Sequence, residues 1–364
     1  MKASTKSRFF LFAFVTLLFA IGILMVFDTT SAEVIDRNIN VSTRHAFYRQ
    51  LICGFFSILV GLLVYFLGIH KMLTLSPYLF YVLTLCLILV FVPGVGQQIN
   101  GAHRWVGVGS FSFQPSEFMK LVMPLYFIWF FFKKEEITWL RFSLIIFTLL
   151  APLVLILIEP DNGTVMIIVV TMMSLFFICR IKWIYWVLPI VCLGGLGSII
   201  VMQTPHAKER IRIYINPQTD LLGKGHQPYQ AKIAAGSGGL CGRGLGQSLQ
   251  KLNYLPEARS DYIAAIYAEE FGFVGILFLV FLYLSVTYSG FYIAFKARQK
   301  AGIYLASTLT FLIAFQAFLN LGVVSGLLPS KGTNLPFFSQ GGSSLLTSTI
   351  AVALIMSTYR MDRS

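Results

Sequence analysis

Four acidic residues crowd the start of one long apolar segment. In "LPEARSDYIAAIYAEEFGFVG" (255–275), Glu257, Asp261, Glu269 and Glu270 stand before or inside a run that continues through "ILFLVFLYLSV", long enough to cross a bilayer. An ionisable group at such a place carries a desolvation penalty of about 3 kcal/mol, so a functional role is the default hypothesis. Carboxylates at an interface can act as general bases or nucleophiles toward a substrate hydroxyl or sugar.

In a helix, Glu269 and Glu270 would lie too far from Asp261 to act as its paired carboxylate. Paired carboxylates that cleave glycosidic bonds lie about 5–5.5 Å apart in retaining enzymes and about 6.5–9.5 Å apart in inverting ones. If the segment is helical, Glu269 lies about 12 Å along the axis from Asp261 and about 80° around it, and Glu270 about 180° around. We therefore expect Asp261 to act without a paired carboxylate. Glu257 and Arg259 are expected to shape the approach to Asp261, and Glu269 and Glu270 to make structural polar contacts.

Composition indicates a polytopic, all-α membrane protein. The 364 residues are 57% hydrophobic and 12% charged, with a mean hydropathy of +0.76, which excludes an ordinary soluble domain. The net charge of +13 comes in small groups between hydrophobic segments, so membrane topology explains it better than nucleic-acid binding. The five cysteines have no metal-type spacing and predict neither a disulfide framework nor a metal site.

The apolar runs predict about ten spanning helices in a single domain of residues 1–364. A count of Lys and Arg in the short loops places both termini in the cytoplasm, since that side receives 14 basic residues and the other side six. A long loop, 203–260, then faces outward between the seventh and eighth helices. The predicted spans are 9–27, 50–68, 73–92, 118–132, 142–158, 163–179, 183–202, 265–290, 302–323 and 342–357.

Unusual polar residues gather in the outward loops, so the chemistry is expected on the outer face. Glu117 and Lys120 are spaced for an ion pair on one helix face, and that structural interpretation competes with substrate binding. Arg104 beside Trp105 fits an interfacial anchor as well as a binding residue. Lys331 is the one basic residue of its loop, and anion binding and a structural salt bridge are equally good interpretations.

Four outward stretches together resemble the SEDS family (shape, elongation, division and sporulation) of peptidoglycan glycosyltransferases. They occur in family order, and within the family the chain is closer to the FtsW branch, which acts in division, than to the RodA branch. Gln340 stands where family members commonly have Tyr, so no role is carried over to it. The four stretches are "GAHRWVGVG...FQPSEFMK", "EPDNGT", "AAGSGGLCGRGLGQSLQKLNYLPEARSDYIAAIYAEEFGFVG" and "GLLPSKGTNLPFFSQGGSS".

The resemblance implies polymerisation of lipid II at the outer face of the bacterial cytoplasmic membrane, at the division septum, with Asp261 as catalytic residue. A lipid pyrophosphate leaves as a stable anion, so a base for the incoming hydroxyl suffices, and the hypothesis is direct, inverting displacement. Cations should meet the departing pyrophosphate, in the order Lys331, Arg259, Arg104, with Mg²⁺ or Mn²⁺ as a further candidate. The full set of predicted substrate-binding residues is Lys331, Arg259, Arg104, Lys120, Glu257, Lys251 and Ser343, and the predicted structural polar residues are Glu117, Asp161, Glu269 and Glu270.

The resemblance also implies partners, while two other functions remain open. The implied partners are a class B penicillin-binding protein that carries the transpeptidase, other divisome proteins and lipid II, without nucleic acid. A flippase for a lipid-linked precursor should show related halves and polar residues at the membrane midplane, and no convincing internal repeat is found. A division scaffold without activity would leave Asp261 unexplained.

Overall fold

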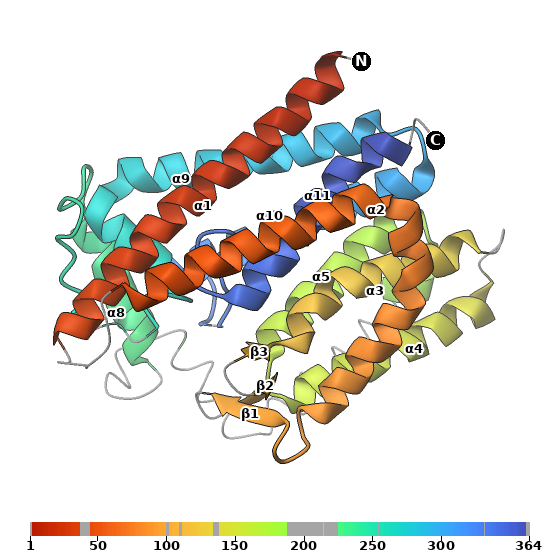
Figure 1. Cartoon of the computed structure of the whole chain (residues 1–364), viewed down its shortest axis with the longest axis horizontal. Coiled ribbons are helices and arrows are strands. Elements are labelled where there is room, and N and C mark those ends of the chain that lie inside the picture. Colours follow the sequence, from red (N-terminus) through yellow and green to blue (C-terminus); the bar gives the residue numbers. More distant parts are fainter. Residues whose placement is uncertain are drawn as a thin grey trace.

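A bundle of long helices makes up most of the computed structural model, and all of these helices run between the same two ends (Figure 1). Both chain termini lie at one end, and the small sheet and α8 lie at the other. The structure describes residues 2–36, 44–99, 102–108, 111–133, 138–187, 214, 225–252, 255, 257–330 and 332–361. The helices are α1 (Lys2–Asp36), α2 (His45–Leu89), α3 (Pro115–Phe132), α4 (Trp139–Ile158), α5 (Asn162–Ile178), α8 (His226–Ser237), α9 (Ile263–Lys296), α10 (Lys300–Val324) and α11 (Gly342–Met361).

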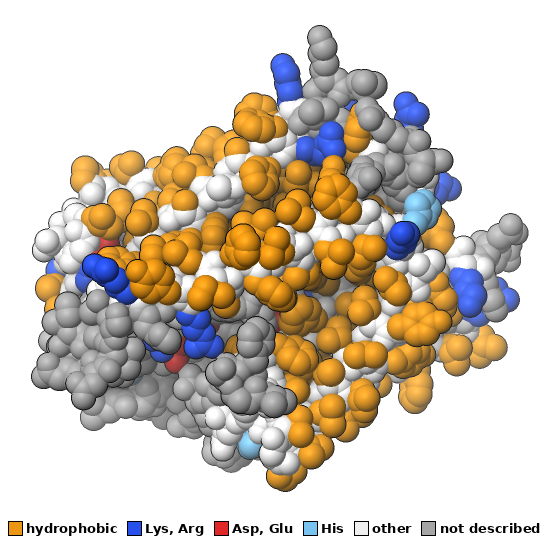
Figure 2. Space-filling model, viewed as in Figure 1, with side chains coloured by type: hydrophobic (Ala, Val, Ile, Leu, Met, Phe, Trp, Pro, Cys, Tyr) orange, Lys and Arg blue, Asp and Glu red, His pale blue; other side chains and the backbone are white. Residues whose placement is uncertain are grey.

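The helical, membrane-spanning class predicted from composition is confirmed. Within the described ranges, six helices are long and apolar enough to cross a membrane, and α5 is a shorter apolar helix. The spans of α1, α2 and α4 are only 28% buried inside the protein, whereas those of α10 and α11 are 67% buried. Hydrophobic side chains cover the face crossed by α1 and α2 (Figure 2). The outer helices therefore present apolar side chains to lipid, and α10 and α11 form the centre.

The predicted spans fall on these helices except for 183–202, most of which lies outside the described residues. Spans 50–68 and 73–92 are the two halves of α2, which breaks at Gly68, where φ is +74°. The short spans 118–132 and 342–357 are extended by polar turns, to 115–132 and 342–361. Of the predicted outer loop 203–260, the described part includes α8.

A three-stranded antiparallel sheet interrupts the helices and was not predicted. It consists of β1 (Gly96–Ile99), β2 (Ala102–Val108) and β3 (Phe111–Phe113) in the order β1-β2-β3. Val106 pairs with Gly96 on one side and with Phe113 on the other, and a bulge lies between Gln97 and Gln98. The sheet precedes α3 in the chain, and its strand β2 carries Arg104. The sheet therefore positions a cation at the end of the bundle where α8 also lies.

A break inside α9 brings a glycine-rich loop against the helix. At Gly272 φ is +66°, and a Cβ built there would stand 2.6 Å from the carbonyl oxygen of Leu240 and 2.8 Å from the carbonyl carbon of Cys241. Gly242, with φ at +80°, approaches the carbonyl of Glu270 equally closely. Only glycine combines this conformation with such proximity. These glycines therefore serve close packing of backbone on backbone.

Candidate active site

Asp261 lies two residues before α9 and is held through its backbone. Its carbonyl oxygen accepts a hydrogen bond of 2.8 Å from Asn320 Nδ2 of α10, and the same amide group donates to the carbonyl of Thr333 at 2.6 Å. A Cβ built on Gly332 would stand 2.9 Å from Asp261 Oδ2. The carboxyl group therefore rests against bare backbone at Gly332, and a larger residue there would displace it.

The segment between Gly332 and α11 also holds the backbone of residues 259–260, directly before Asp261. Ser339 Oγ donates to the carbonyl of Ser260 at 2.6 Å and accepts from the amide of Leu335 at 2.8 Å. The amide of Gln340 donates to the carbonyl of Arg259 at 3.0 Å. With three consecutive carbonyls held, at positions 259 to 261, the direction of the Asp261 side chain is preorganised.

No hydrogen bond from the described residues reaches the carboxylate oxygens of Asp261, and the residue is partly exposed. Its pKa is raised from 3.8 to about 7; burial is the largest cause, the charges of Glu257 and Asp161 also raise it, and the charge of Arg104 lowers it. A base with a pKa near the working pH combines a useful ionised fraction with a strong pull on a proton. Asp261 is thus free to accept a proton from a substrate hydroxyl.

A second acidic stretch, "EPDNGT" between α4 and α5, packs on the same segment. A Cβ on Gly163 would stand 3.1 Å from Thr333 Cγ2 and 3.5 Å from the carbonyl oxygen of Gly332. Asp161 caps α5 by accepting from the amide of Thr164 at 3.2 Å and also accepts from Gln114 Nε2 at 3.1 Å. Asp161 therefore makes local polar contacts that stabilise the start of α5.

Glu159 is a component of the site that the sequence analysis missed. It is fully buried, and neither carboxyl oxygen has a hydrogen-bond partner among the described residues. Burial and the Asp161 charge raise its pKa to about 8, against a lowering by Arg104. Glu159 is therefore protonated at neutral pH. The signal in the sequence was a second carboxylate two residues from Asp161 at the end of an apolar run.

Arg104 reaches from β2 to this stretch, where its side chain donates to two carbonyl groups. The distances are 3.1 Å to the oxygen of Glu159 and 2.8 Å to that of Pro160. Its charge also acts on Asp261 and Glu159. The structure therefore brings Arg104 into the electrostatic surroundings of Asp261, a closer relation to the site than an interfacial anchor requires.

The predicted ion pair between Glu117 and Lys120 is confirmed, at 2.8 Å. Lys120 is 3% exposed, and its ammonium also donates to Gln316 Oε1 at 3.1 Å. Gln316 Nε2 in turn donates to the carbonyl of Asn334 at 2.9 Å. The pair thereby ties α3 through α10 to the segment that holds Asp261, and substrate binding by Lys120 would require this network to open.

Lys251 does not lie among substrate-binding groups, which corrects the prediction for this residue. Its ammonium contacts both carboxylate oxygens of Asp28 in α1 at 2.7 Å and Glu270 Oε1 at 2.8 Å. At 7% exposure it is enclosed. The ammonium is neutralised by two carboxylates, so its task is to join α1 to α9.

The structural contacts expected of Glu269 and Glu270 are present. Glu269 accepts from the hydroxyl of Ser248 and from the amides of Leu249 and Gln250, and Glu270 accepts from the amide of Ser248 and from Lys251. Both residues are 1% exposed. They bind the 248–251 turn, so they are not partners of Asp261, in agreement with the geometric expectation. The assumption of continuous helix was wrong for the first two residues, because α9 begins at Ile263.

The remaining predicted residues are placed as follows. Glu257 is exposed, with φ at +56°, and accepts from Ser260 Oγ at 2.7 Å. Arg259 is half-buried. Ser343, at the start of α11, accepts from the amide of Gln114 at 3.1 Å. Lys331 lies outside the described residues.

Gln340, the departure from the family pattern, has a buried side-chain oxygen without a partner in the described part of the chain. No metal cluster was predicted, and the described ranges hold no group of three or more His, Cys, Asp or Glu arranged to bind a metal ion. Assistance by Mg²⁺ or Mn²⁺ stays a prediction. The phosphates of a substrate could carry such an ion without a protein cluster.

Apolar spans around a helical core, with a partly buried carboxylate near one end, define a multipass membrane protein with a candidate acid–base site. A family model described as "Cell cycle protein", for FtsW, RodA and SpoVE, matches residues 8–364. The chain belongs to this family.

Its relatives cover nearly the whole chain. It is 36% identical over 351 residues to "Stage V sporulation protein E" of Bacillus subtilis, with 95% of each chain covered. It is also 36% identical to "Probable peptidoglycan glycosyltransferase FtsW" of Coxiella burnetii, covering 93% of this chain and 92% of the other.

Solved structures of similar proteins share this fold over nearly the whole chain. A chain from the structure reported as "Structural coordination of polymerization and crosslinking by a peptidoglycan synthase complex" superposes with a TM-score of 0.78 at 25% identity, covering 96% of this chain and 97% of that one. The rod shape determining protein RodA of Thermus thermophilus superposes with a TM-score of 0.68 at 25% identity, covering 96% and 95%. The predicted family resemblance is confirmed.

Proposed function

We propose that this protein is a peptidoglycan glycosyltransferase that polymerises lipid II at the outer face of the bacterial cytoplasmic membrane. The observation that carries the proposal is the placement of Asp261: its backbone is fixed by two segments, its carboxylate is open to a substrate, and its pKa is about 7. Relatives named "Probable peptidoglycan glycosyltransferase FtsW" support the reaction type. The proposal includes a role in cell division, at the septum, and the family description "Cell cycle protein" supports a role in the cell cycle.

In the proposed reaction Asp261 takes the proton from the acceptor sugar hydroxyl. The hydroxyl oxygen then forms a bond to the anomeric carbon of the donor, the bond from that carbon to the lipid pyrophosphate breaks, and the configuration inverts. Asp161 is a poor alternative base because its oxygens already accept from Thr164, Gln114 and Ser116. Glu159 is a poor one because it is completely enclosed and protonated.

The departing pyrophosphate gains negative charge on its bridging oxygen and needs positive groups nearby. Arg104 is the described cation whose charge reaches Asp261. Arg259, two residues from Asp261, and Lys331, adjacent to Gly332, complete the proposed set. Their closeness in sequence to Asp261 and to Gly332 supports this choice.

Orientation and partners complete the proposal. Both termini lie in the cytoplasm, in accordance with the distribution of Lys and Arg, so Asp261 lies at the outer end of the bundle. A class B penicillin-binding protein is the proposed partner, together with other divisome proteins. A structural neighbour comes from a complex that joins polymerization and crosslinking, and this supports the choice of partner.

The test uses purified full-length protein with lipid II, with and without the transpeptidase partner. Glycan polymer formed by the wild type and lost in Asp261→Asn, with equal folded yield, is the expected result. A general base contributes about 10²–10⁴-fold, so residual polymerisation should be below about 1% of wild type. Transfer of lipid II across vesicles without polymer would instead support a flippase, and full polymerisation by Asp261→Asn would refute the assigned base.

A further inference from the structure

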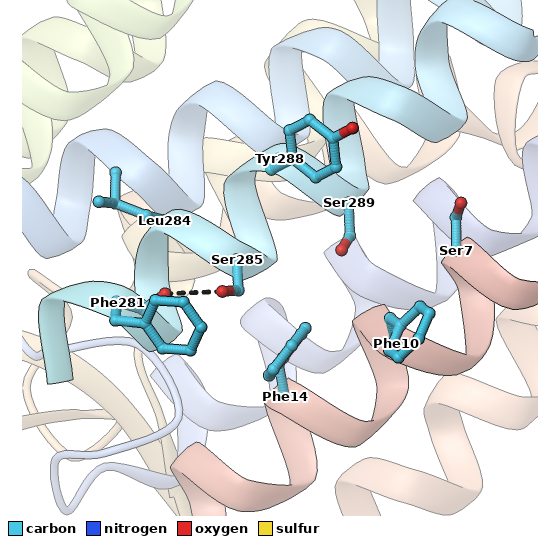
Figure 3. A pocket seen from close by; sticks show the side chains of 8 residues that line it. All are labelled: Ser7, Phe10, Phe14, Phe281, Leu284, Ser285, Tyr288 and Ser289. Atoms are coloured by element: carbon cyan, nitrogen blue, oxygen red, sulfur yellow. Dashed lines mark hydrogen bonds between the residues drawn. The ribbon is translucent and has the colours of Figure 1, made fainter. Parts of the chain in front are cut away.

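A groove lies between α1 and α9, in the half of the bundle that holds both chain termini (Figure 3). Phe14 of α1 and Phe281 of α9 close it toward the middle of the bundle, where their rings meet edge to face with centroids 6.4 Å apart. Its volume of about 440 Å³ lies within the range of about 300–1,000 Å³ typical of ligand sites. Toward the termini it is lined by Ser7 and Phe10 of α1 and by Leu284, Ser285, Tyr288 and Ser289 of α9.

The polar contacts of α1 explain why this space stays open. At the other end of the bundle, Lys251 joins Asp28 of α1 to α9. Near the termini, α1 is instead tied to α2 and α11. There Arg8 donates to the hydroxyl of Tyr65 at 3.4 Å and lies over the ring of Tyr359, 4.4 Å from its centroid. The two helices therefore have an ionic link at one end, whereas at the other end their facing side chains enclose the groove.

Each wall of the groove leads to a lysine at the end with the termini. On α1, Lys6 stands four residues before Phe10 and therefore shares a helix face with it. On α9, the ring of Tyr288 lies 6.2 Å from that of Tyr292, and the ammonium of Lys296 lies 5.7 Å from the centroid of the Tyr292 ring. Both lysines are exposed, and within the described part of the chain neither ammonium has a carboxylate partner.

This end of the groove is basic and rich in hydrogen-bond donors. The sequence contains no Asp or Glu in 2–27 or in 271–296, and Lys and Arg side chains lie at this end of the surface (Figure 2). Hydroxyl groups of Ser7, Tyr288 and Ser289 line the groove there and can donate to phosphate or ester oxygens. An apolar groove that ends at cations and hydroxyl groups is complementary to the acyl chain and headgroup of an anionic lipid.

The size of the groove favours a lipid chain over a partner helix. An α-helix with its side chains is about 10 Å across, so about 440 Å³ holds no more than about one helical turn. An acyl chain is thin enough to lie along the stacked rings of Phe10 and Phe14, whose centroids are 6.3 Å apart. The occupant with matching shape and charge is therefore a phospholipid.

We infer that the α1/α9 groove binds an acyl chain of an anionic phospholipid whose phosphate contacts Lys6 and Lys296. In the proposed orientation this lipid belongs to the cytoplasmic leaflet. It fills the space that the protein leaves between α1 and α9, and it holds the first helix at the end remote from Lys251. The inference goes beyond the proposed reaction and does not depend on it, because Asp261 lies at the opposite end of the bundle.

The experiment is photo-crosslinking of the purified full-length protein in phosphatidylcholine nanodiscs. The probes are radiolabelled phosphatidylglycerol and, for comparison, the same amount of radiolabelled phosphatidylcholine. A benzophenone amino acid replaces Phe10 in the groove or, as the control, Phe147 of α4, which is 76% exposed and lies outside the groove. Position 10 should be labelled more strongly by phosphatidylglycerol than by phosphatidylcholine, whereas position 147 should not distinguish the two lipids. Equal labelling of position 10 by both lipids, or the same preference at position 147, would mean annular lipid only and overturn the inference.

The charge of the site is tested by removing one lysine at a time. Lys6→Gln and Lys296→Gln should each lower the labelling of position 10 by phosphatidylglycerol about fivefold, the effect of one cation near a headgroup, and should leave labelling by phosphatidylcholine unchanged. Lys182→Gln is the matched control, because Lys182 also lies over a tyrosine ring, that of Tyr185 at 6.0 Å, but in the segment after α5. A double variant of Lys6 and Lys296 that keeps the full preference for phosphatidylglycerol would refute the headgroup site.

The space is tested by filling it. Ser285→Phe should lower the labelling of position 10, whereas Thr148→Phe on α4 should not. The two positions are matched, since Ser285 Oγ donates to the carbonyl of Phe281 at 2.8 Å and Thr148 Oγ1 to that of Leu144 at 3.0 Å. Unchanged labelling in Ser285→Phe would place the lipid outside the groove and overturn the site. Crosslinking of position 10 in cell membranes to a protein instead of a lipid would show that a partner covers the groove, and would equally overturn the inference.

Discussion

The pH dependence of polymerisation should report the ionisation of Asp261. Because burial raises the pKa of this carboxyl to about 7, about a tenth of the molecules carry the ionised base one pH unit below that value and about nine tenths one unit above it. The rate at low lipid II concentration should therefore rise about tenfold across these two units. An ordinary aspartate with a pKa of 3.8 would give a flat profile over the same range.

Glu257→Gln should move this limb in a defined direction. The Glu257 charge is the second cause of the raised pKa after burial, so its removal lowers the pKa and shifts the limb to lower pH. The limb should stay above 3.8 because burial, the larger cause, remains. At one pH unit below 7, each half unit by which the pKa of Asp261 falls should raise the rate about threefold, and the total increase cannot exceed about tenfold.

The assay is the initial rate of lipid II polymerisation at constant ionic strength, measured between about pH 5 and about pH 9. Glu136→Gln is the control for the loss of one negative charge, since this residue stands in the sequence between the ends of α3 and α4 that are remote from Asp261. A wild-type limb centred near pH 4, or a Glu257→Gln limb that stays in place or moves to higher pH, would refute the electrostatic reasoning.

Three further variants test the surroundings of Asp261. Asp261→Asn should be inactive yet at least as heat-stable as wild type above pH 7. A carboxyl whose pKa rises from 3.8 to about 7 on folding destabilises the folded protein progressively as the pH rises between these values. Melting curves of both proteins at about pH 5 and about pH 8 check this prediction. Gly332→Ala should lower turnover about 10²-fold without loss of folded protein, because the new Cβ would stand 2.9 Å from Asp261 Oδ2 and displace it; unchanged turnover would contradict this geometry. Glu269→Ala should lower the yield of folded protein more than the rate per molecule, because the hydroxyl and amide groups of the 248–250 turn lose their buried acceptor, at about 1–3 kcal/mol for each group left unpaired; normal yield with abolished turnover would show a direct catalytic role.

The sequence predicted the helices well because long apolar runs have few alternatives in a membrane. It predicted the Glu117–Lys120 pair for a similar reason, since both residues lie on one helix and their spacing decides the contact. The sheet at 96–113 was missed because its strands are short and its pairing depends on turns between them. The predicted spans 50–68 and 73–92 anticipated the break at Gly68, whereas the break at Gly272 was missed because a glycine in an apolar run carries no local sign of its backbone angles.

Contacts between remote segments were the hardest to predict. Lys251 was assigned to substrate binding as one of the cations of the outer loop, and its partner Asp28, 223 residues away, is visible only in the fold. Asn320 is a single polar residue near the end of an apolar span, and only the fold shows that it holds both Asp261 and Thr333. Charge balance and hydrogen bonding at this distance are properties of the assembled bundle.

The pairing of Asp28 with Lys251 has a consequence for biogenesis. The ribosome makes Asp28 long before Lys251 and Glu270, so α1 enters the bilayer with an unpaired carboxylate. In a chain arrested before position 251, α1 should remain loosely associated and sensitive to quality-control proteases. Synthesis of the 248–251 turn then provides the counter-ion that locks the first helix in place, so assembly of the amino-terminal part is complete only after about two thirds of the protein has been translated.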